Sequence, residues 1–487
     1  MDSTTETSFV PTADRPVPVS SQRAFGLDAL RGLAILLMVL SAHLSWGVFP
    51  SWMYHAQVPP PDHRFDPGIP GITWVDLVFP LFLFCMGAAF PVALGRRLAA
   101  GRAHGRVVLD ILHRGFLLGF FAIFHQHMMP HVLDPDRGTP ALLTSMAGFG
   151  LMFAVFCRFP DSWKWWVPWA VRAGGWFSVV VLLATVEYPD GSGFSLYRSN
   201  IILVVLTNMA VFGALIYLVV QRHATVYLGI LLAFIAIRLS AGEEGVVQAL
   251  YRNSPVPWIF HMRYLQYLHV VIPGILAGRL LWDWMRAGEA ARETGGGWSE
   301  RRWAVLAAFL LMFSAAVLIG LQERWLWQTN LLAAAGIGAG AWITKAPGGV
   351  SETFIRSVFL WGAAWLVIGL LFEPYEGGIK KDSATISYYY VCAALSSFLL
   401  ASFIVVIDRL KKKHWVRLLV DNGQNPMIAY VGGGLFVIPV LTLLGVHGWL
   451  MEWAREPWPV FFRALGYTLL VALMVRFFTR RKIFWRT

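Results

Sequence analysis

The chain has 487 residues, of which 57% are hydrophobic and only 14% are charged, and its mean hydropathy is +0.58. Soluble globular proteins carry about 25% charged residues, so this composition excludes a soluble enzyme. It also excludes a disordered chain, because so much apolar surface can be buried. We therefore expect an all-α protein, a polytopic bundle of transmembrane helices.

The formal net charge is +12. The basic residues stand in short clusters between apolar runs, and no basic stripe predicts a nucleic-acid partner. The cysteines Cys85, Cys157 and Cys392 lie in or beside apolar runs without CxxC spacing. This pattern argues against a disulfide framework and against a cysteine-based zinc site, so we expect no metal cofactor.

Residues 1–26 form a polar tail rich in Ser, Thr and Pro, without the apolar core of a signal peptide, and residues 27–487 form the predicted membrane domain. A spanning helix needs about 20 mostly apolar residues. The runs near 168, 225 and 328 are short or contain Gly, so we expect between twelve and fourteen spans. The apolar runs lie near residues 28–48, 74–94, 107–126, 140–157, 168–187, 200–220, 225–240, 268–285, 303–321, 328–344, 357–373, 386–407, 424–446 and 458–478.

The distribution of basic residues predicts the orientation. If successive runs cross in alternate directions, 29 of the 40 Lys and Arg residues fall on the side of the N-terminus and 11 on the other side. Cytoplasmic loops carry the excess of Lys and Arg. We therefore expect both termini in the cytoplasm and the loops 49–73, 125–139 and 373–385 outside.

The first span carries three ionisable residues. Asp28 and Arg31 are three positions apart, so they share one helix face and can pair. His43 follows twelve residues after Arg31, about 18 Å farther along a helix. Ionisable side chains in a span cost desolvation energy, which favours pairing or function. Alternatively, the Asp28–Arg31 pair anchors the helix at the membrane interface, and His43 is a hydrogen-bonded core residue.

The second span begins with an acid. Asp76 lies at the helix entrance, where it can cap the N-terminus, and Pro80 lies within the first turns, where a missing N–H costs least. Capping alone accounts for Asp76 as well as a functional role does.

Three histidines, His125, His127 and His131, have a spacing that suggests a metal site. Pro130 interrupts the helix that would bring His127 and His131 together, so we do not predict a metal there.

Five blocks stand out along the chain: LDALRGLAILLMVL (27–40), His55-Ala56, DLVFPLFLFCMG (76–87), GQNPMIAYVG (423–432) and RRKIFWR (480–486). In their order and spacing they resemble the heparan-alpha-glucosaminide N-acetyltransferase family and its bacterial relatives, part of a wider group of transmembrane acyltransferases. Two further segments, GILAGRLLWDW (274–284) and EPYEGGIKKDSATISY (373–388), are most similar to the bacterial branch.

The resemblance implies a ten-helix core, so the additional runs would be two helix pairs inserted within 200–373. It implies transfer of an acetyl group from cytoplasmic acetyl-CoA to an amino sugar or other saccharide across a bacterial inner (plasma) membrane. The family's catalytic histidine of the first outer loop matches His55. The chain departs from the family in its inserted PPPDHRFDPGIPG, and in Ala42 where relatives have Asn, which makes the adjacent His43 a rival.

Acyl transfer from a thioester needs a base near neutral pH, which a histidine supplies, as general base or as acyl carrier. Asp76 or Asp28 can orient that histidine. Asn425 is a candidate donor to the oxyanion. Cations for the CoA phosphates include Arg31, paired with Asp28, and Lys381.

A different class of function is a transporter or flippase of a sugar-containing lipid or polymer. Charged residues in spans suit both classes, but no two halves of the chain repeat one another, as they do in many transporters. The expected partners are acetyl-CoA, a saccharide acceptor and membrane lipid. The acceptor, the acyl chain length and the oligomeric state, including a homo-oligomer, stay open.

Overall fold

The computed structural model describes residues 23–159, 162–288, 292 and 297–486, so most of the predicted polar tail lies outside the described residues. Within these ranges every regular element is a helix, and one isolated antiparallel bridge joins Cys157 to Trp485. The predicted all-α class is confirmed.

Twelve helical segments in the described part of the chain are long and apolar enough to cross a membrane, so the protein is a multi-pass membrane protein. Three of these spans include a 3₁₀ or π-helical segment, or a run of short helices, beside the named helix. The spans are α1 (Phe25–Ala42), α2 (Trp74–Ala99), α3 (His104–His127), α5 (Thr139–Phe156), α6 (Trp166–Thr185), α7 (Ile201–Val220), α10 (Leu268–Arg286, preceded by Met262–Tyr267), α12 (Glu300–Gln322), α14 (Val350–Leu371), α15 (Ile386–Ile404, continued by Val405–Arg409), the succession α17 (Pro426–Gly432), Gly433–Val437 and α18 (Ile438–Leu443), and α20 (Pro457–Arg480).

All fourteen predicted apolar runs are helical. The runs near 225 and 328 form α8 (Ala224–Ser240) and α13 (Leu326–Ile343), which are not among the twelve candidate spans. The run near 168 forms α6, which is one of them. The remaining short helices are α4 (Pro130–Leu133), α9 (Val246–Arg252), α16 (Arg417–Gly423) and α19 (Val446–Trp453).

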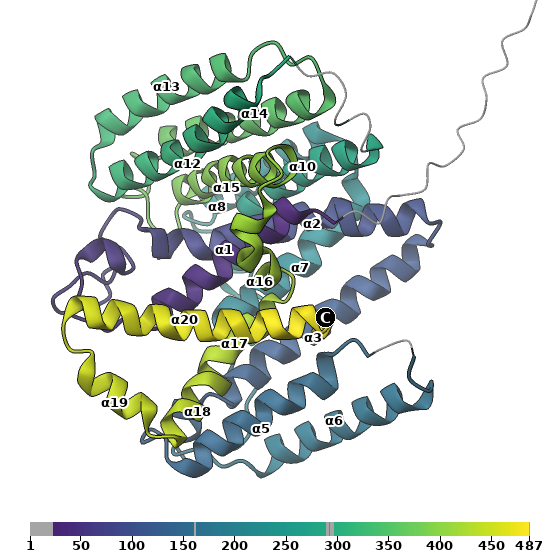
Figure 1. Ribbon diagram of the computed structural model, residues 1–487, viewed down its shortest axis with the longest axis vertical. Helices are drawn as coiled ribbons and strands as arrows, with labels where there is room; N and C mark the ends of the chain where they lie inside the picture. The colour runs from purple at the N-terminus through teal and green to yellow at the C-terminus, as the bar shows by residue number, and fades with distance from the viewer. Residues whose placement is uncertain (1–22, 160–161, 289–291, 293–296, 487) are drawn as a thin grey trace, which may run out of the picture.

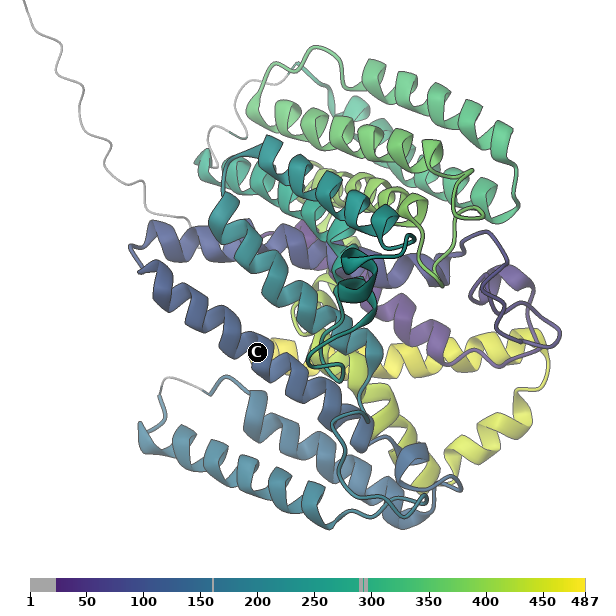
Figure 2. The same ribbon diagram turned by 180° about the vertical axis from the view of Figure 1, so that it is seen from behind.

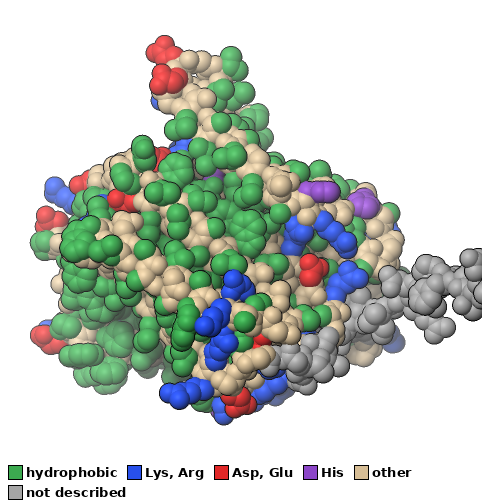
Figure 3. Space-filling view, turned by 90° about the horizontal axis from the view of Figure 1, so that it is seen from above, with side chains coloured by type: hydrophobic (Ala, Val, Ile, Leu, Met, Phe, Trp, Pro, Cys, Tyr) green, Lys and Arg blue, Asp and Glu red, His purple; other side chains and the backbone are tan. Residues whose placement is uncertain are grey.

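The centre of the bundle is α15, in which every residue is buried. It packs against α1, α2, α10, α12 and α14, and α2 packs along α10 (Figures 1 and 2). By contrast, α6 lies at the periphery and exposes Trp169 and Phe177. Figure 3 shows hydrophobic side chains over a wide part of one face, as expected for a surface that meets lipid.

The start of α1 and the end of α20 lie toward the same end of the bundle, which we call the terminal end (Figures 1 and 2). Here Lys413 lies 3.0 Å over the ring of Phe25, and Arg23 lies 5.7 Å from the ring of Phe484. The loop 43–73 lies at the opposite end, the loop end. The distribution of basic residues assigns the start of α1, Lys413 and the end of α20 to the same side of the membrane. They also lie together at the terminal end.

A close contact between two glycines holds the terminal end together. A Cβ atom on Gly32 of α1 would lie 1.8 Å from the carbonyl oxygen of Leu419, and one on Gly423 would lie 1.8 Å from the carbonyl oxygen of Asp28. Only glycine allows α1 and α16 to approach so closely. The sequence blocks LDALRG and GQNP are therefore joined in space.

Candidate active site at the loop end

The site is built on the first turn of α2. The hydroxyl of Thr73 accepts a hydrogen bond from the Val75 N–H, and the N–H of Thr73 donates to Asp76 Oδ2 at 3.0 Å, which completes a capping box. Asp76 is fully buried, and the N–H of Ala56 donates to the same Oδ2 at 3.1 Å. The cap predicted for Asp76 is confirmed, and it uses one carboxylate oxygen.

The second carboxylate oxygen binds the predicted catalytic histidine. Nδ1 of His55 lies 2.6 Å from Oδ1 of Asp76, while the side chain of His55 is one-third exposed. Because Nδ1–H donates to the carboxylate, the neutral ring keeps its lone pair on Nε2. Of the two acids expected to orient a histidine, Asp76 is the one that does so. The His55 ring and the Ala56 N–H both bind the carboxylate of Asp76.

A cation from a distant loop completes the cluster. Nζ of Lys381 lies 3.1 Å from Nδ1 and 3.4 Å from Nε2 of His55, across a sequence separation of 326 residues. Tyr388 of α15 donates from its hydroxyl to the carbonyl of Asp76 at 2.7 Å. We predicted Lys381 as a cation for CoA phosphates, which stays a prediction, and the structure places its ammonium group against His55.

The loop 373–385 that carries Lys381 is held by buried and half-buried ion pairs. Nη2 of Arg324 lies 2.6 Å from Glu373, and Nε of Arg238 lies 2.6 Å from Glu376. The N–H of Gly71 donates to the carbonyl of Ile379 at 2.7 Å, which ties this loop to the loop 43–73. Helices α8 and α13 thus help to position this loop, since Arg238 lies in the last turn of α8 and Arg324 precedes α13.

His55 and Lys381 line a cavity of about 980 Å³, close to the upper range of small-molecule sites. A π-helical segment, Gly433–Val437, forms part of its wall, and such segments are frequent at functional sites. His43 also lines it, and its Nδ1 donates to the carbonyl of Val39 at 2.6 Å. The other polar lining residues include Ser41, Tyr54, His125, His131, Asp136, Arg137, Asn200, Tyr267, Asp382, Tyr430, Thr442 and His447.

Desolvation lowers the pKa of three histidines that line this cavity, His43, His131 and His447. The pKa of His43 is lowered by desolvation and then by the charge of Arg463, against a backbone hydrogen bond that raises it. The cavity therefore presents neutral rings, which can donate or accept hydrogen bonds, to a polar ligand.

The other predicted residues lie at the terminal end. Asp28 pairs with Arg31 at 3.5 Å, as its spacing predicts, and more closely with Arg23 at 3.1 Å. Asn425 donates from Nδ2 to the carbonyl of Ile483 at 2.8 Å and accepts from the Trp485 N–H at 3.2 Å. Its amide fixes the C-terminal segment and is not part of the cavity wall, so this arrangement gives no support to the oxyanion role.

Sequence reasoning missed several residues of the cavity. His447, Asn200 and Tyr430 line it, and the hydroxyl of Tyr430 donates to Asn200 at 3.2 Å. His125 and His131 were considered only as metal ligands. A usable signal was present, because these histidines and His447 all fall on the side of the membrane that has few basic residues.

Among the residues with assigned positions, no group of three or more His, Cys, Asp or Glu is arranged to hold a metal ion. His127 is bound instead to the Tyr188 hydroxyl and the Ser195 carbonyl. The chemistry that the site offers is proton transfer at Nε2 of His55, beside an ammonium group that can face developing negative charge.

Comparison of the chain with protein-family models finds a match. The model of DUF5009, described as a domain of unknown function, matches residues 23–282, which is more than half of the chain. The matched region contains His43, His55 and Asp76 but ends before Lys381. A search of the curated proteins finds no match. The chain therefore belongs to the DUF5009 family.

Proposed function

We propose that the protein is a transmembrane acyltransferase that moves an acetyl group from acyl-CoA to an amino sugar or another saccharide, with His55 as the general base. The observation that carries this proposal is the hydrogen bond of 2.6 Å between His55 and a fully buried carboxylate, at the wall of a large cavity. A buried carboxylate that fixes the histidine tautomer is the arrangement that general-base catalysis needs.

The reaction follows from the positions of these groups. The acceptor amine or hydroxyl attacks the thioester carbonyl carbon, and Nε2 of His55 takes its proton as the new bond forms. Collapse of the tetrahedral intermediate breaks the carbon–sulfur bond, and the protonated ring returns the proton to the thiolate of CoA. Lys381, within 3.4 Å of Nε2, supplies positive charge near the developing oxyanion.

The cavity favours a saccharide acceptor. It offers neutral histidines, amides and hydroxyls, which match the hydroxyl groups of a sugar. Trp46 and Tyr54 stack with ring centroids 5.7 Å apart at the cavity wall, and rings of this kind present an apolar face with a polar edge. By the alternation of the apolar runs, 11 basic residues are assigned to the side of the loop end and 29 to the other side, where a phosphate-bearing acyl-CoA is favoured.

This difference supports donor entry from the terminal end, which we place in the cytoplasm by the positive-inside rule. The loop end then faces outward, and the membrane is a bacterial inner membrane if the resemblance to the bacterial relatives holds. The description of DUF5009 assigns no activity, so the likeness of blocks 27–40, 55–56, 76–87, 423–432 and 480–486 to the heparan-alpha-glucosaminide N-acetyltransferase family is the further support.

The test uses purified protein in detergent, isotope-labelled acetyl-CoA and a panel of amino sugars, with products measured by mass spectrometry. We expect labelled N-acetyl sugar with the wild type and a loss of about 10²-fold to 10⁴-fold with His55→Ala. The matched control is His261→Gln, a loop-end histidine that does not line the cavity. Wild-type rates in His55→Ala would move the base to His43. Binding of sugar lipids without any consumption of acetyl-CoA would favour the transporter or flippase.

A further inference from the structure

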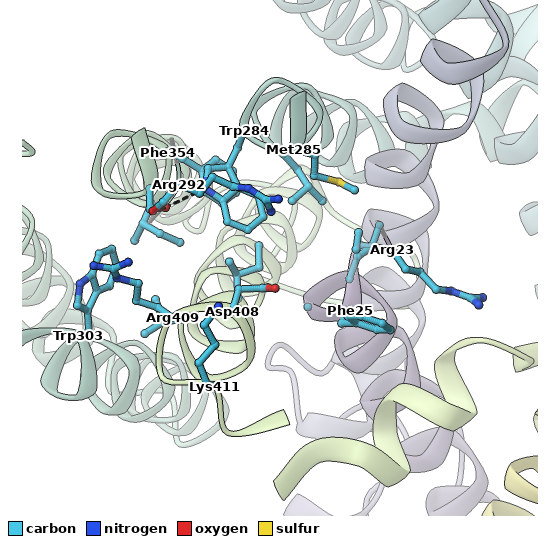
Figure 4. Close-up of a pocket in the computed structure, with 18 residues that line it drawn as sticks. Arg23, Phe25, Trp284, Met285, Arg292, Trp303, Phe354, Asp408, Arg409 and Lys411 are labelled. Carbon is cyan, nitrogen blue, oxygen red and sulfur yellow. Dashed lines mark hydrogen bonds between the residues drawn. The ribbon is translucent and has the colours of Figure 1, made fainter. Parts of the chain in front are cut away.

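A second cavity lies at the terminal end, away from His55. Its volume is about 330 Å³, which is within the range of small-molecule sites. It is bordered by the beginnings of α1, α12 and α14 and by the ends of α10 and α15 (Figure 4). None of the residues used in the proposed acyl transfer lines it.

The wall combines cations with aromatic rings. Arg23, Arg292, Arg409 and Lys411 line the cavity, against one acid, Asp408. Arg23 is paired with Asp28, and the three other cations around so small a space make it a site for a multiply charged anion, because guanidinium and ammonium groups bind phosphate oxygens by charge-assisted hydrogen bonds.

The rings are arranged as a firm flat surface. Trp284 and Phe354 stack with centroids 5.1 Å apart, and the guanidinium of Arg292 lies 4.6 Å over Trp284. A hydrogen bond of 3.1 Å from Trp284 Nε1 to Ser351 fixes the indole. Figure 4 shows these rings on one side of the cavity, with Phe25 on the other.

The acid Asp408 adds a second kind of binding group to the cavity. The carboxylate of Asp408 points into the space between Met285 and Phe25 (Figure 4). The charged groups that act on it are Arg292, Lys411 and Lys413. Asp408 and Arg409 belong to the π-helical segment Val405–Arg409, which turns both side chains to the same cavity. A carboxylate beside phosphate-binding cations selects a ligand that also carries an N–H donor.

We propose that this cavity binds a phosphate ester that carries an amino group, with its phosphate on Arg409 and Lys411 and its amino group on Asp408. Two sources have this chemistry at the terminal end. One is an adenine nucleotide, such as the nucleotide of CoA, a source that rests on the proposed function. The other is the headgroup of an aminophospholipid, which does not.

The nucleotide arm measures binding of ADP and of IDP to the full-length protein in detergent by calorimetry, without any transfer reaction. IDP lacks the amino group. We expect ADP to bind more tightly than IDP, and Asp408→Asn to remove that preference. Arg409→Gln and Lys411→Gln should each weaken ADP binding about tenfold or more, the usual loss of one charge-assisted hydrogen bond.

The lipid arm measures retention of phosphatidylethanolamine and phosphatidylcholine by the protein in nanodiscs, using native mass spectrometry. Phosphatidylcholine has a phosphate but no N–H donor. Selective retention of phosphatidylethanolamine that is lost in Arg409→Gln and Lys411→Gln would identify the lipid as the ligand.

Lys412→Gln is the control in both arms, because Lys412 is exposed, as its neighbour Lys411 is, but does not line the cavity. Absence of binding by both nucleotides and lipids would overturn the proposal. So would equal losses in Lys411→Gln and Lys412→Gln, since the cations would then act only as surface charge. Failure of the sugar-transfer assay leaves both binding results unaffected, so the two proposals fail separately.

Discussion

At the scale of single residues, the site depends on how Asp76 divides its two oxygens. Oδ2 accepts the N–H groups of Thr73 and Ala56, and Oδ1 accepts from His55. A carboxylate can accept on both sides, whereas an amide has one acceptor and one donor side. Replacing Asp76 by asparagine therefore tests this arrangement directly.

Asp76→Asn should reduce acyl transfer about 10²-fold to 10⁴-fold while the protein stays folded. The amide oxygen would be retained by the two N–H groups of the cap, and the amide NH₂ would then donate to Nδ1 of His55. The ring proton would move to Nε2, and the base would be lost. Steady-state rates and the thermal midpoint Tm, compared with those of the exposed loop variant Asp62→Asn, provide the measurement. Full activity with a normal Tm would show that the tautomer is not important.

The sequence predicted only part of this cluster. Both the acid at the start of the second span and the histidine matched by resemblance were candidates, because short-range spacing and a motif were enough to find them. Lys381 was found as a candidate cation, but its position beside His55 was not predicted. Its contact with His55 spans 326 positions and depends on how α15 and the loop 373–385 pack, which local patterns do not contain.

At the scale of helices, periodicity and length were reliable. Each predicted apolar run forms a helix, since an apolar stretch in a membrane must satisfy its backbone hydrogen bonds internally. Hydropathy could not predict that α8 and α13 position the loop 373–385. Arg238 and Arg324, at one end of each helix, hold Glu376 and Glu373 of the loop beside the site.

The contact of α1 with α16 gives a prediction about stability. Gly32→Ala should lower the free energy of unfolding by about 1–3 kcal/mol or more, because the new methyl group would overlap the Leu419 carbonyl and push the helices apart. Gly338→Ala is the control. Gly338 lies within α13 with no atom near its missing Cβ, so alanine should be neutral or slightly stabilising there. Tm values in detergent measure both. Equal Tm values for the two variants would contradict the close packing.

At the scale of the whole molecule, a cavity rich in histidine and a cavity rich in cations lie at opposite ends of the described part of the chain. The sequence predicted this polarity through the uneven distribution of basic residues. It could not predict the cavities, because their walls come from helices that are far apart in the sequence.

The histidine-lined end predicts a dependence of stability on pH. His43, His131 and His447 have lowered pKa values in the folded protein, whereas in the unfolded chain histidine titrates near about 6.5. Below that pH the unfolded chain binds more protons than the folded one, so stability decreases as the pH falls and is complete above about 7.

Tm measured from pH 7.5 to 5.5 should therefore decrease, and His447→Gln should reduce the decrease. A glutamine keeps a hydrogen-bonding group near the Tyr467 hydroxyl, which lies 2.8 Å from Nδ1 of His447, and does not titrate. A constant Tm down to pH 5.5 would contradict the burial of these rings in the neutral form.

The central claim is that an acetyl group crosses from a donor at the terminal end to an acceptor at the loop end. Its most direct test uses sealed vesicles with the terminal end outward. Labelling of Lys412→Cys, and protection of Asp62→Cys, from an impermeant maleimide verifies that orientation, since all three native cysteines are free and buried. An amino sugar on a polymer too large to cross is enclosed, and labelled acetyl-CoA is added outside. We predict label on the enclosed sugar with the wild type and none with His55→Ala. Label that appears only when donor and acceptor share one compartment would contradict the account.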